Sequence, residues 1–507
     1  SGKTMAAMLP LLDRCLREEW AGMSILYITP LRALNRDVDR RLDEITSAVG
    51  LRLGLRHGDT PQSERNKHVR NPPNVMITTP ETFQLMFTGS KLRELLRTVQ
   101  AVVIDEVHEM ADGERGWQLS IGLSRLESFK GSKVQKIGLS ATVGNPKQVA
   151  RWLSPDAEAI NAIAPRTTEL SVDAVVQLPE DEIGSLELAI SPRAHATLRG
   201  LADIVAEKNP CLIFVNSRNS AETVSQRIQA IAPDLEIGVH HGSLAKETRT
   251  QMEDDLRNGK IQGLVCTSSL ELGIDVGSVN HIVQIRSPRS VDRMLQRVGR
   301  ADHRLGGVGS GHLLGWESDD IFEAAVIARK AVAGEIEPVE WRDRPLSVAA
   351  NQIVMMVHSH GALPIKEITE SISGAYQFEG WNDDDTISIG KVLADRWVIR
   401  CEDNPSEVPW YRWPHDVWQE LLKVSKKPLP EQPKLAYDEE PTEDLARLKF
   451  DPPPKFAKGW ISRSGRTRQW VTKHLSMIPD KQSYRVRDAV TRKSLGNVDE
   501  AFVLSLN

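Results

Sequence analysis

The sequence has no excess of positive charge, because its 64 Lys and Arg residues are outnumbered by 69 Asp and Glu residues. Net charge therefore gives no support to a nucleic-acid surface, and such a surface must come from local clusters of basic residues. Cysteine is scarce as well. The four cysteines are scattered and lack the spacing of metal ligands: Cys15, Cys211, Cys266 and Cys401. This pattern fits a reducing cytosol better than a disulfide framework.

Long apolar runs are also missing. No stretch reaches the length needed to cross a bilayer, and the first residues do not form a signal peptide. We therefore expect a cytoplasmic protein with no membrane partner. With 507 residues, the chain is long enough for three or four domains that each bury a core of their own.

The stretch 101–108, with the sequence AVVIDEVH, is the feature around which the rest of the chain is organised. Its apolar half predicts a strand buried on both faces of a parallel sheet, and such sheets bind ligands at the carboxyl ends of their strands. Asp105 is placed to hold Mg²⁺, and Glu106 is placed to orient or deprotonate a water molecule. For these two acids alone, a strand end capped by solvated carboxylates is the alternative.

The first residues, Ser-Gly-Lys-Thr, have the form of the second half of a glycine-rich phosphate loop, and a helical pattern follows them. In a complete loop, the backbone amides and the helix N-terminus surround the phosphates. Lys3 would then reach the β- and γ-phosphates, and the Thr4 hydroxyl would bind Mg²⁺. The first half of the loop is not in the chain, so we expect a fragment that is cut at both ends.

Further apolar segments with polar carboxyl ends predict the rest of two sheets. They lie at 24–29, 75–77 and 137–139 in the first part of the chain, and at 211–215, 237–239, 264–266 and 282–285 in the second. Because helical patterns separate them, each part is predicted to be a doubly wound parallel sheet, with a strand entering the second sheet near 172–176. Arg32 and Thr79 follow two of these strands in turns that can face a phosphate backbone.

The predicted helix 291–298 introduces a basic group beside the second sheet. Gln296, Arg297 and Arg300 lie on or next to this helix, and His303 and Arg304 follow it. Such runs usually form a solvated helix face. Next to a nucleotide cleft, we interpret them as clamps on the γ-phosphate.

The pattern changes after residue 340. An amphipathic helix at 345–361, a second helix at 364–373 and a helix and strand at 390–400 resemble a winged helix, which either binds a groove or braces the lobes. Residues 426–453 are rich in proline and charge and predict a linker. Residues 455–473 combine basic side chains with Phe456, Trp460 and Trp470, the composition of a surface that stacks on single strands. A solvated helix with two buried tryptophans is the alternative.

Taken together, these blocks resemble the motor core of superfamily-2 helicases. In chain order they are GKT, TPLRAL, TTPE, DEVH, SAT, FVNSR, HHGSL, TSSLELGID and QRVGRADHR, and they extend over residues 1–315. The segment DEVHEMADGERGWQLSIGLSRL is similar to the large-helicase-related (Lhr) family. The resemblance implies an α/β fold with two tandem RecA-like parallel-sheet lobes, followed by a winged-helix domain and a partial further domain.

The implied domains are lobe one at 1–165, lobe two at 166–340, the winged helix at 341–425, and a linker with the start of a strand-binding domain at 426–507. The implied activity is that of an ATP-dependent 3′→5′ helicase that unwinds DNA or RNA–DNA duplexes with a 3′ tail, as a monomer, in DNA repair. Its cofactors would be ATP and Mg²⁺, and its partner single-stranded DNA. An RNA helicase is one alternative. A non-catalytic strand clamp is another, although it would have no chemical need for Lys3, Glu106 and Arg300.

The resemblance also assigns roles to the matching residues. It implies nucleotide or metal binding by Gly2, Lys3, Thr4, Asp105, Gly273, Asp275 and Arg300, and catalysis by Lys3, Asp105, Glu106, Gln296, Arg300 and Arg304. It implies strand contacts by Arg32, Thr79, Arg218, Ser243 and Thr267, and coupling of hydrolysis to lobe movement by His108, Ser140 and Thr142. Asp302 stands where the family has glycine, and its carboxylate would repel phosphate unless it is paired.

Overall fold

The computed structural model describes residues 2–30, 32–141, 143–161, 168–271, 279–301, 309–435, 439, 441–474, 483–487 and 494–499. The chain divides into two compact units. Unit one comprises Ser1–Asp112 and Leu126–Arg342, and unit two comprises Gly113–Arg125 and Asp343–Asn507. Unit one contains two separate parallel sheets, here named lobe one and lobe two.

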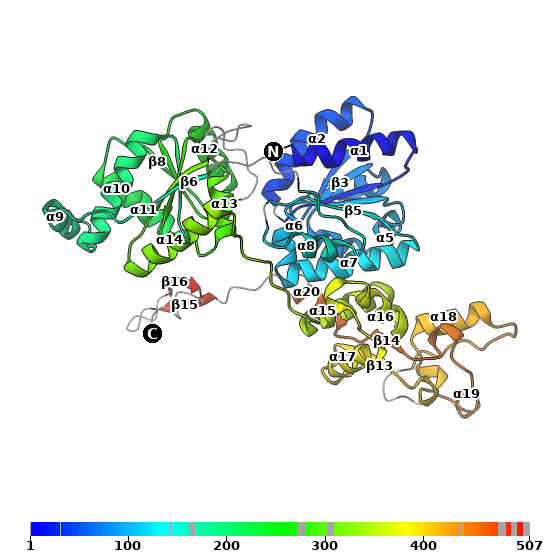
Figure 1. Cartoon of the computed structure of the whole chain (residues 1–507). Helices are drawn as coiled ribbons and strands as arrows, with labels where there is room; N and C mark the ends of the chain where they lie inside the picture. The colour runs from blue at the N-terminus through cyan, green and yellow to red at the C-terminus, as the bar shows by residue number, and fades with distance from the viewer. Residues whose placement is uncertain are drawn as a thin grey trace. The chain divides into compact units, whose positions relative to one another are not determined.

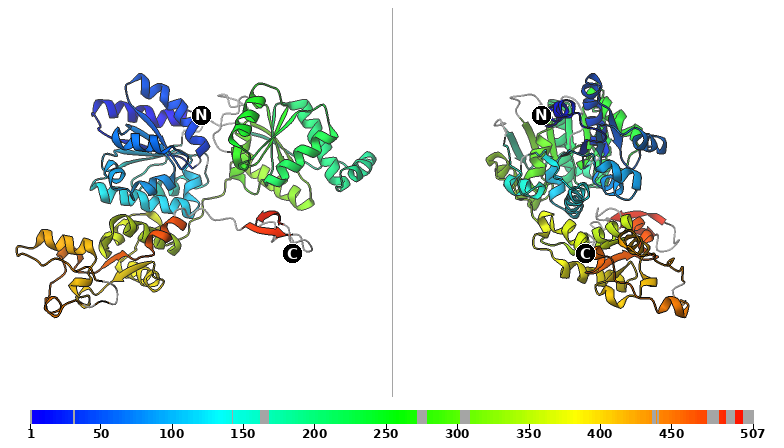
Figure 2. Two further views of the ribbon diagram at one scale, coloured as in Figure 1. Left: turned by 180° about the vertical axis from the view of Figure 1, so that it is seen from behind. Right: turned by 90° about the vertical axis from the view of Figure 1, so that its right-hand side faces the viewer.

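Lobe one is a parallel sheet with helices on both faces (Figures 1 and 2). Among its described residues, the strands lie in the order β2-β3-β1-β4-β5. They are β1 (Ile25–Ile28), β2 (Leu53–Arg56), β3 (Val75–Thr78), β4 (Ala101–Ile104) and β5 (Gln135–Gly138). The helices are α1 (Lys3–Arg17), α2 (Arg32–Ala48), α3 (Gln62–Arg70), α4 (Pro80–Met86), α5 (Ser90–Leu96), α6 (Val107–Ala111) and α8 (Pro146–Leu153). Helix α7 (Glu114–Lys130) is divided, because its residues up to Arg125 belong to unit two and the rest to lobe one. Strands β1, β3 and β4 are buried along their whole length, as their apolar sequences require.

Lobe two is a second parallel sheet, with the described strands in the order β6-β11-β10-β7-β9-β8. They are β6 (Thr168–Asp173), β7 (Cys211–Phe214), β8 (Ile237–His240), β9 (Gly263–Cys266), β10 (His281–Ile285) and β11 (Gly309–Leu314). The helices are α9 (Pro179–Glu187), α10 (Pro192–Lys208), α11 (Arg218–Ile231), α12 (Lys246–Arg257), the 3₁₀ turn η1 (Ser268–Leu270), α13 (Val291–Val298) and α14 (Ser318–Ala333). The two predicted parallel-sheet lobes are thus confirmed.

Three strands in the described part of the lobes differ most from the prediction. Strand β2 was not predicted, because its sequence LGLR has only two large apolar residues, and β11 was not predicted because GSGHLL begins with small and polar residues. Both strands gain their place from parallel pairing with fully buried apolar strands, β2 with β3 and β11 with β10. Strand β6 begins at Thr168, earlier than the predicted 172–176, because it pairs with β11 along all six residues.

Unit two combines helices with short strands. The described elements are α15 (Leu346–His360), β12 (Ala362–Pro364), α16 (Ile365–Ser373), η2 (Tyr376–Phe378), α17 (Asp383–Asp395), β13 (Ile399–Glu402), η3 (Pro405–Glu407), η4 (Trp410–Arg412), α18 (His415–Val424), α19 (Glu443–Ala446), η5 (Pro454–Phe456), β14 (Trp460–Arg463), α20 (Thr467–Lys473), β15 (Ser483–Arg487) and β16 (Ser494–Asp499). Strands β12, β14 and β13 form an antiparallel sheet in that order, and β15 pairs with β16. The winged helix stays a prediction for this region.

The pairing of strand β14 corrects the predicted domain boundary between residues 425 and 426. It lies in the range assigned to a separate strand-binding domain, yet it pairs with β12 and β13 and completes their sheet. Part of the predicted linker is also packed, because Leu429, Leu445 and Phe450 lie against a tryptophan cluster. The predicted amphipathic helix 345–361 is α15, whose residues 351–357 are buried on every side.

The cysteines are all free, which agrees with the absence of a disulfide framework. Cys15, Cys211 and Cys266 are buried, and Cys401 is half-buried. Burial raises the pKa of the Cys211 thiol and of the Cys401 thiol to about 12 in each case. Among the described residues, no helix is both long and apolar enough to cross a membrane.

Trp460 is the centre of a stability prediction. Its ring is fully buried and meets Trp413 and Phe456 edge-to-face at centroid distances of 6.3 and 6.2 Å. Because truncation leaves a large cavity, we expect Trp460→Ala to lower the free energy of unfolding of unit two by about 3–5 kcal/mol in urea denaturation. Trp397→Ala is the matched control, since this tryptophan is 61% exposed and should change stability by no more than about 0.5 kcal/mol. Equal effects of the two substitutions would contradict the packing role.

Candidate functional site

The candidate site lies at the carboxyl edge of the lobe-one sheet. Register pairing places Ile28 beside Thr78 on one side and Ile104 on the other, so the residues after β1, β3 and β4 share one edge. Asp105 and Glu106 directly follow β4. The amino end of α1 lies at the same place, because the Lys3 ammonium donates to the Ser140 carbonyl after β5 at 2.7 Å.

Gly2 gives α1 its starting geometry. It occupies the N-cap position with a φ of 74°, in the left-handed region that glycine enters at low cost. A helix N-terminus offers unpaired backbone N–H groups and a partial positive charge, both suited to an anion. Lys3 adds a full positive charge at the first helical position. The start of α1 therefore has the chemistry of a phosphate site.

Asp105 is a largely buried carboxylate held by two donors. The Tyr27 hydroxyl donates to Oδ2 at 2.8 Å, and the Glu106 amide donates to Oδ1 at 3.0 Å. Burial raises the pKa of Asp105 above its usual range, and the nearby Glu106 charge adds to this, while the Tyr27 hydrogen bond opposes it. Burial also raises the pKa of Tyr27, so this side chain remains a neutral donor.

Tyr27 connects the two residues predicted to bind Mg²⁺. Thr4 hydrogen-bonds the same phenolic oxygen that donates to Asp105, so one hydroxyl links the start of α1 to the end of β4. A hydroxyl and a carboxylate are oxygen ligands of the kind that Mg²⁺ prefers, and Mg²⁺ is usually bound by few protein groups together with substrate phosphates. The residues present therefore fit this ion. Sequence reasoning missed Tyr27, because it lies within an apolar strand.

Glu106 has an unusual backbone. Its φ of 46° and ψ of 49° lie in the left-handed region, which costs a non-glycine residue of order 1–3 kcal/mol. The conformation ends β4 and starts α6, and it places Glu106 Oε2 3.7 Å from His108 Nδ1. Strain of this kind persists where the surrounding structure fixes the chain, and it often accompanies a functional side chain.

His108 links the predicted coupling residues. Its Nδ1 lies 3.1 Å from Ser140 Oγ, and its Nε2 lies 3.0 Å from Gln296 Nε2 of lobe two. Burial, with a contribution from the Lys3 charge, lowers the pKa of His108 to about 4, so the ring is neutral at pH 7. A neutral ring accepts at one nitrogen and donates at the other. The Gln296 amide thus donates to Nε2, and Nδ1–H donates to Ser140.

The two arginines near α13 have different surroundings. Arg300 Nη2 donates to the Glu271 carbonyl at 3.0 Å. Arg297 is 3% exposed, donates to the Glu271 carboxylate at 2.9 Å and to the Gln284 side chain, and lies over the Phe214 ring. Arg297 is therefore part of the interior of lobe two, which corrects its interpretation as a phosphate clamp.

The predicted strand contacts fall into two groups. Arg218 and Ser243 are exposed in lobe two, and Thr267 is half-buried, with its hydroxyl 3.5 Å from Ser269 Oγ. Thr79 is 4% exposed, and its hydroxyl caps α4 by accepting from the Thr82 amide at 3.4 Å. Arg32 begins α2. Thr142, Gly273, Asp275, Asp302, His303 and Arg304 lie outside the described residues, and their roles stay predictions.

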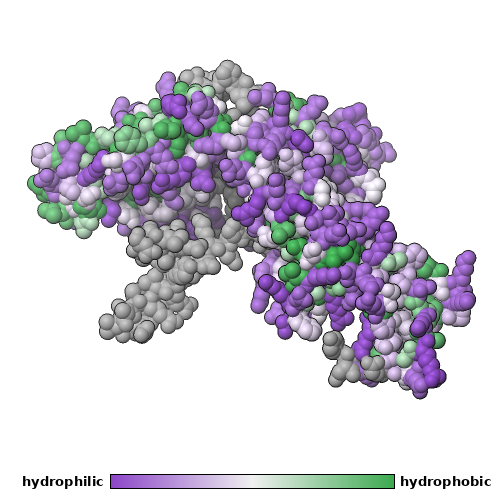
Figure 3. Space-filling view, turned by 60° about the horizontal axis from the view of Figure 1, so that its bottom comes forward, coloured by the Kyte–Doolittle hydropathy of each residue, from purple (hydrophilic) through white to green (hydrophobic). Residues whose placement is uncertain are grey.

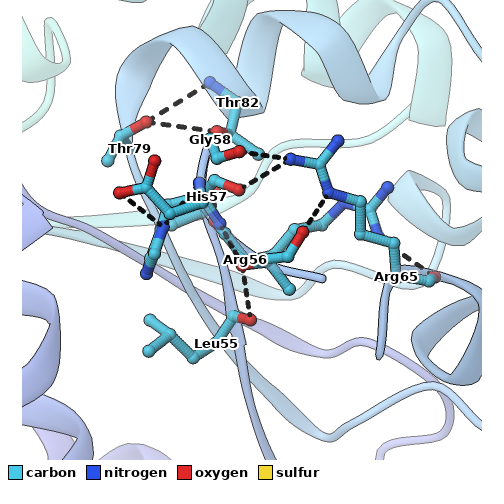
Figure 4. A network of polar contacts seen from close by, with 10 residues as sticks. Leu55, Arg56, His57, Gly58, Arg65, Thr79 and Thr82 are labelled. Atoms are coloured by element: carbon cyan, nitrogen blue, oxygen red, sulfur yellow. Dashed lines mark hydrogen bonds and ion pairs between the residues drawn. The ribbon is translucent and has the colours of Figure 1, made fainter. Parts of the chain in front are cut away.

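The turn 57–60 beside Thr79 was not predicted as part of the site. Figure 4 shows it held by the Arg65 guanidinium, which donates to the His57 carbonyl at 3.1 Å, to the Gly58 carbonyl at 2.7 Å and to the Thr60 carbonyl at 2.8 Å. The turn follows β2 and so lies at the same sheet edge. A correct prediction of β2 would have revealed it.

The tryptophans of unit two do not have a common role. The complete burial of Trp460 corrects the prediction that its ring stacks on bases. Trp470 is half-buried and stacks on His474 at a centroid distance of 4.4 Å, so a contact with bases stays a prediction for this residue.

Comparisons with known proteins relate this architecture to helicases. Residues 1–149 match the family model for DEAD/DEAH box helicases, and residues 196–306 match the helicase conserved C-terminal domain. Among curated relatives, the Lhr helicase/probable uracil glycosylase of Mycolicibacterium smegmatis is 36% identical over 70% of this chain and 26% of its own length. The ATP-dependent helicase Lhr-Core of Methanothermobacter thermautotrophicus is 33% identical over 78% of this chain and 48% of its own length. The chain thus spans from about a quarter to about half of the length of these curated relatives.

Solved structures agree with these matches. The Mycobacterium smegmatis helicase Lhr bound to single-stranded DNA and AMP-PNP is 34% identical, with a TM-score of 0.68 over 79% of this chain and 53% of that one. The DUF1998 helicase MrfA bound to DNA is 24% identical, with a TM-score of 0.60 over 79% of this chain and 52% of that one, which shows a shared fold.

The Tyr27 bridge gives a testable prediction. Tyr27→Phe keeps the buried ring but removes a donor to a carboxylate, a bond worth about 1.5–3 kcal/mol. We expect the Mg²⁺ concentration that half-saturates binding of a fluorescent ADP analogue to rise by about tenfold or more. Tyr411→Phe, in unit two, should leave it unchanged. If Tyr27→Phe lowered thermal stability without altering the Mg²⁺ dependence, the hydroxyl would have only a packing role.

Proposed function

The chain belongs to the Lhr helicase family, and from this premise we propose that it hydrolyses ATP between its two parallel-sheet lobes in order to move along single-stranded DNA. The matches cover 26% and 48% of these two relatives' own length, so the proposal concerns the part that the chain shares with them. We further propose 3′→5′ movement, unwinding of DNA and RNA–DNA duplexes with a 3′ tail, and a place in DNA repair.

The contact that supports this proposal best is made by His108. His108 lies two residues after the acid pair, and its buried neutral ring accepts from Gln296 of lobe two and donates to Ser140 of lobe one. A change at the nucleotide that moves Glu106 or Ser140 would alter this contact, and so would a movement of lobe two. His108 therefore offers a direct physical link between hydrolysis and lobe movement.

The roles proposed for the lobe-one residues follow from their positions. Gly2 and Lys3 bind phosphates at the start of α1, while Thr4 and Asp105 hold the metal ion. Mg²⁺, when bound with ATP, neutralises phosphate charge as the terminal phosphoryl group is transferred. Glu106 orients and deprotonates the attacking water. Its left-handed backbone fixes the carboxylate next to the end of β4, where that water would lie.

The roles proposed for lobe two concern the opposite side of the nucleotide. Arg300 stabilises the charge that develops on the transferred phosphoryl group. Gln296 transmits the state of that group to His108 through their hydrogen bond. Arg218, Ser243 and Thr267 contact the strand backbone, and unit two contains a winged helix. Contacts to the nucleic-acid backbone alone would allow binding of any single strand. The solved Lhr relative is bound to single-stranded DNA, and this supports DNA over RNA as the strand.

A strand-displacement assay of the full-length protein tests the proposal. Matched DNA, RNA and RNA–DNA duplexes would carry a 3′ or a 5′ single-stranded tail and be mixed with ATP and Mg²⁺. We expect displacement of DNA and hybrid duplexes with a 3′ tail, dependent on ATP. Preference for RNA duplexes would favour the RNA helicase, and strand binding without displacement or hydrolysis would favour the clamp.

Glu106→Gln separates binding from catalysis. The substitution keeps the shape of the side chain and removes the base, while the phosphate and metal contacts remain. We expect strand-stimulated ATP hydrolysis to be abolished and ATP and single-strand affinities to change by less than about threefold. Wild-type turnover in this variant would exclude Glu106 as the water-activating group.

Arg300 and Arg297 form a matched pair for a second test. Arg300→Ala should lower kcat by about 10³ or more with a much smaller effect on ATP affinity, as for other arginine fingers. Arg297→Ala leaves the buried Glu271 carboxylate unpaired, so it should instead destabilise lobe two by about 3–5 kcal/mol. If kcat and ATP affinity fell equally in Arg300→Ala, Arg300 would be a ground-state contact.

A further inference from the structure

Helix α9 is attached to lobe two by polar contacts. The Asp181 carboxylate is 0% exposed and accepts from Arg199 Nη2 at 3.0 Å and from Arg199 Nε at 3.1 Å. His195 Nδ1 lies 2.7 Å from the same carboxylate, and the Leu178 amide donates to it at 2.7 Å. The Arg199 guanidinium holds the pKa of Asp181 well below its usual range. The helix is therefore anchored on α10 by a buried ionic group.

Gly184 of α9 also lies close to a side chain of α10. A Cβ atom at Gly184 would lie 2.2 Å from His195 Nε2, so only glycine permits this spacing. Ser185, on the same side of the helix, is buried as well. The inward side of α9 thus consists of an acid, a glycine and a serine.

The outward side of α9 carries large apolar side chains. Ile183 is 67% exposed and Leu186 is 82% exposed, and Val176, just before the helix, is 74% exposed. A surface helix normally buries its apolar side and exposes its polar side. In α9 this arrangement is inverted. Apolar residues are visible at the left end of the surface in Figure 3, where α9 lies in Figure 1.

This inversion distinguishes α9 from ordinary scattered exposure. Single exposed apolar side chains are common, whereas a contiguous group on a firmly held element marks an interaction surface. Ile183 and Leu186 lie three residues apart on one side of α9. Together with the exposed Val176 just before the helix, they are named here the α9 ridge. The ionic anchor keeps the helix in place although its apolar side chains contribute no buried area to lobe two.

The charges around the ridge indicate its partner. Glu180, Glu182 and Glu187 are exposed on the same helix. A nucleic-acid backbone would be repelled by these carboxylates, and a second copy of the chain would bring the same acids face to face. A protein segment with Lys or Arg beside apolar residues would pack on the ridge and pair with the three glutamates around it, which form its acidic rim. We propose that the α9 ridge is the docking site for a basic amphipathic helix of another protein.

The test uses the full-length protein and a defined probe. The probe is a fluorescein-labelled helical peptide of leucine and lysine, with leucine at positions i, i+3, i+4 and i+7, and fluorescence anisotropy measures its binding. The paired control is the same peptide with glutamate in place of lysine. We expect the lysine peptide to bind and the glutamate peptide not to bind, because the rim is acidic.

Three sets of variants locate the binding. Ile183→Ser with Leu186→Ser should weaken the lysine peptide by about tenfold or more, since two apolar contacts are lost. Phe322→Ser with Val326→Ser, which alters exposed apolar residues of α14, should leave its affinity unchanged. Glu180→Gln with Glu182→Gln and Glu187→Gln should weaken binding and reduce its salt dependence. Circular dichroism and thermal melting should show all variants folded, because each changed side chain is exposed.

Several outcomes would overturn the proposal. They are no binding of the lysine peptide, equal binding of both peptides, or equal losses in the α9 and α14 variants. Displacement of the peptide by single-stranded DNA in wild type but not in the ridge variant would identify a nucleic-acid surface instead. A wild-type dimer that becomes a monomer on Ile183→Ser with Leu186→Ser would identify a second copy as the occupant. Strand-stimulated hydrolysis should be unchanged in the ridge variant, so failure here leaves the proposed motor function intact.

Discussion

Parallel pairing of the strands is the constraint on which the described part of both lobes depends. Parallel strands end at a common edge, so residues far apart in sequence meet there while apolar side chains fill both faces of the sheet. Register between β1 and β4 brings Tyr27 beside Asp105, and the order of the strands brings Lys3 to the Ser140 carbonyl. Polar groups can therefore be satisfied at this edge without entering the core.

The buried titratable groups of this nearly neutral chain are stabilised in different ways. Asp105 is kept in place by hydrogen bonds, whereas His108 avoids charge altogether and acts as a neutral donor and acceptor. Arg297 and Asp181 remain ionic inside lobe two, each with a specific partner. Desolvation makes an unpaired buried charge costly, so each of these groups also fixes the element that provides its partner.

The sequence was most informative where local pattern alone determines structure. The apolar run 101–104 and the helix 291–298 have the bounds that were predicted, and the acid pair at 105–106 lies at the sheet edge as expected. Strand β2, Tyr27 and Trp460 could not be assigned in this way. The first depends on pairing with β3, the second on the register of β1 with β4, and the third on a sheet formed with segments about 60 and 100 residues earlier. Long-range pairing is not visible in a local window of residues.

The state of the thiols has a practical consequence for measuring motion in this protein. A thiol with a pKa of about 12 is ionised in only about one molecule in 10⁵ at pH 7, and the thiolate is the form that reacts with maleimides. Burial further shields Cys15 and Cys266 from reagents. A cysteine introduced on an exposed helix of either lobe would therefore be labelled selectively without removal of the native ones. Spectroscopic distance measurements between two such dyes could then test the proposed coupling of nucleotide hydrolysis to movement of the lobes.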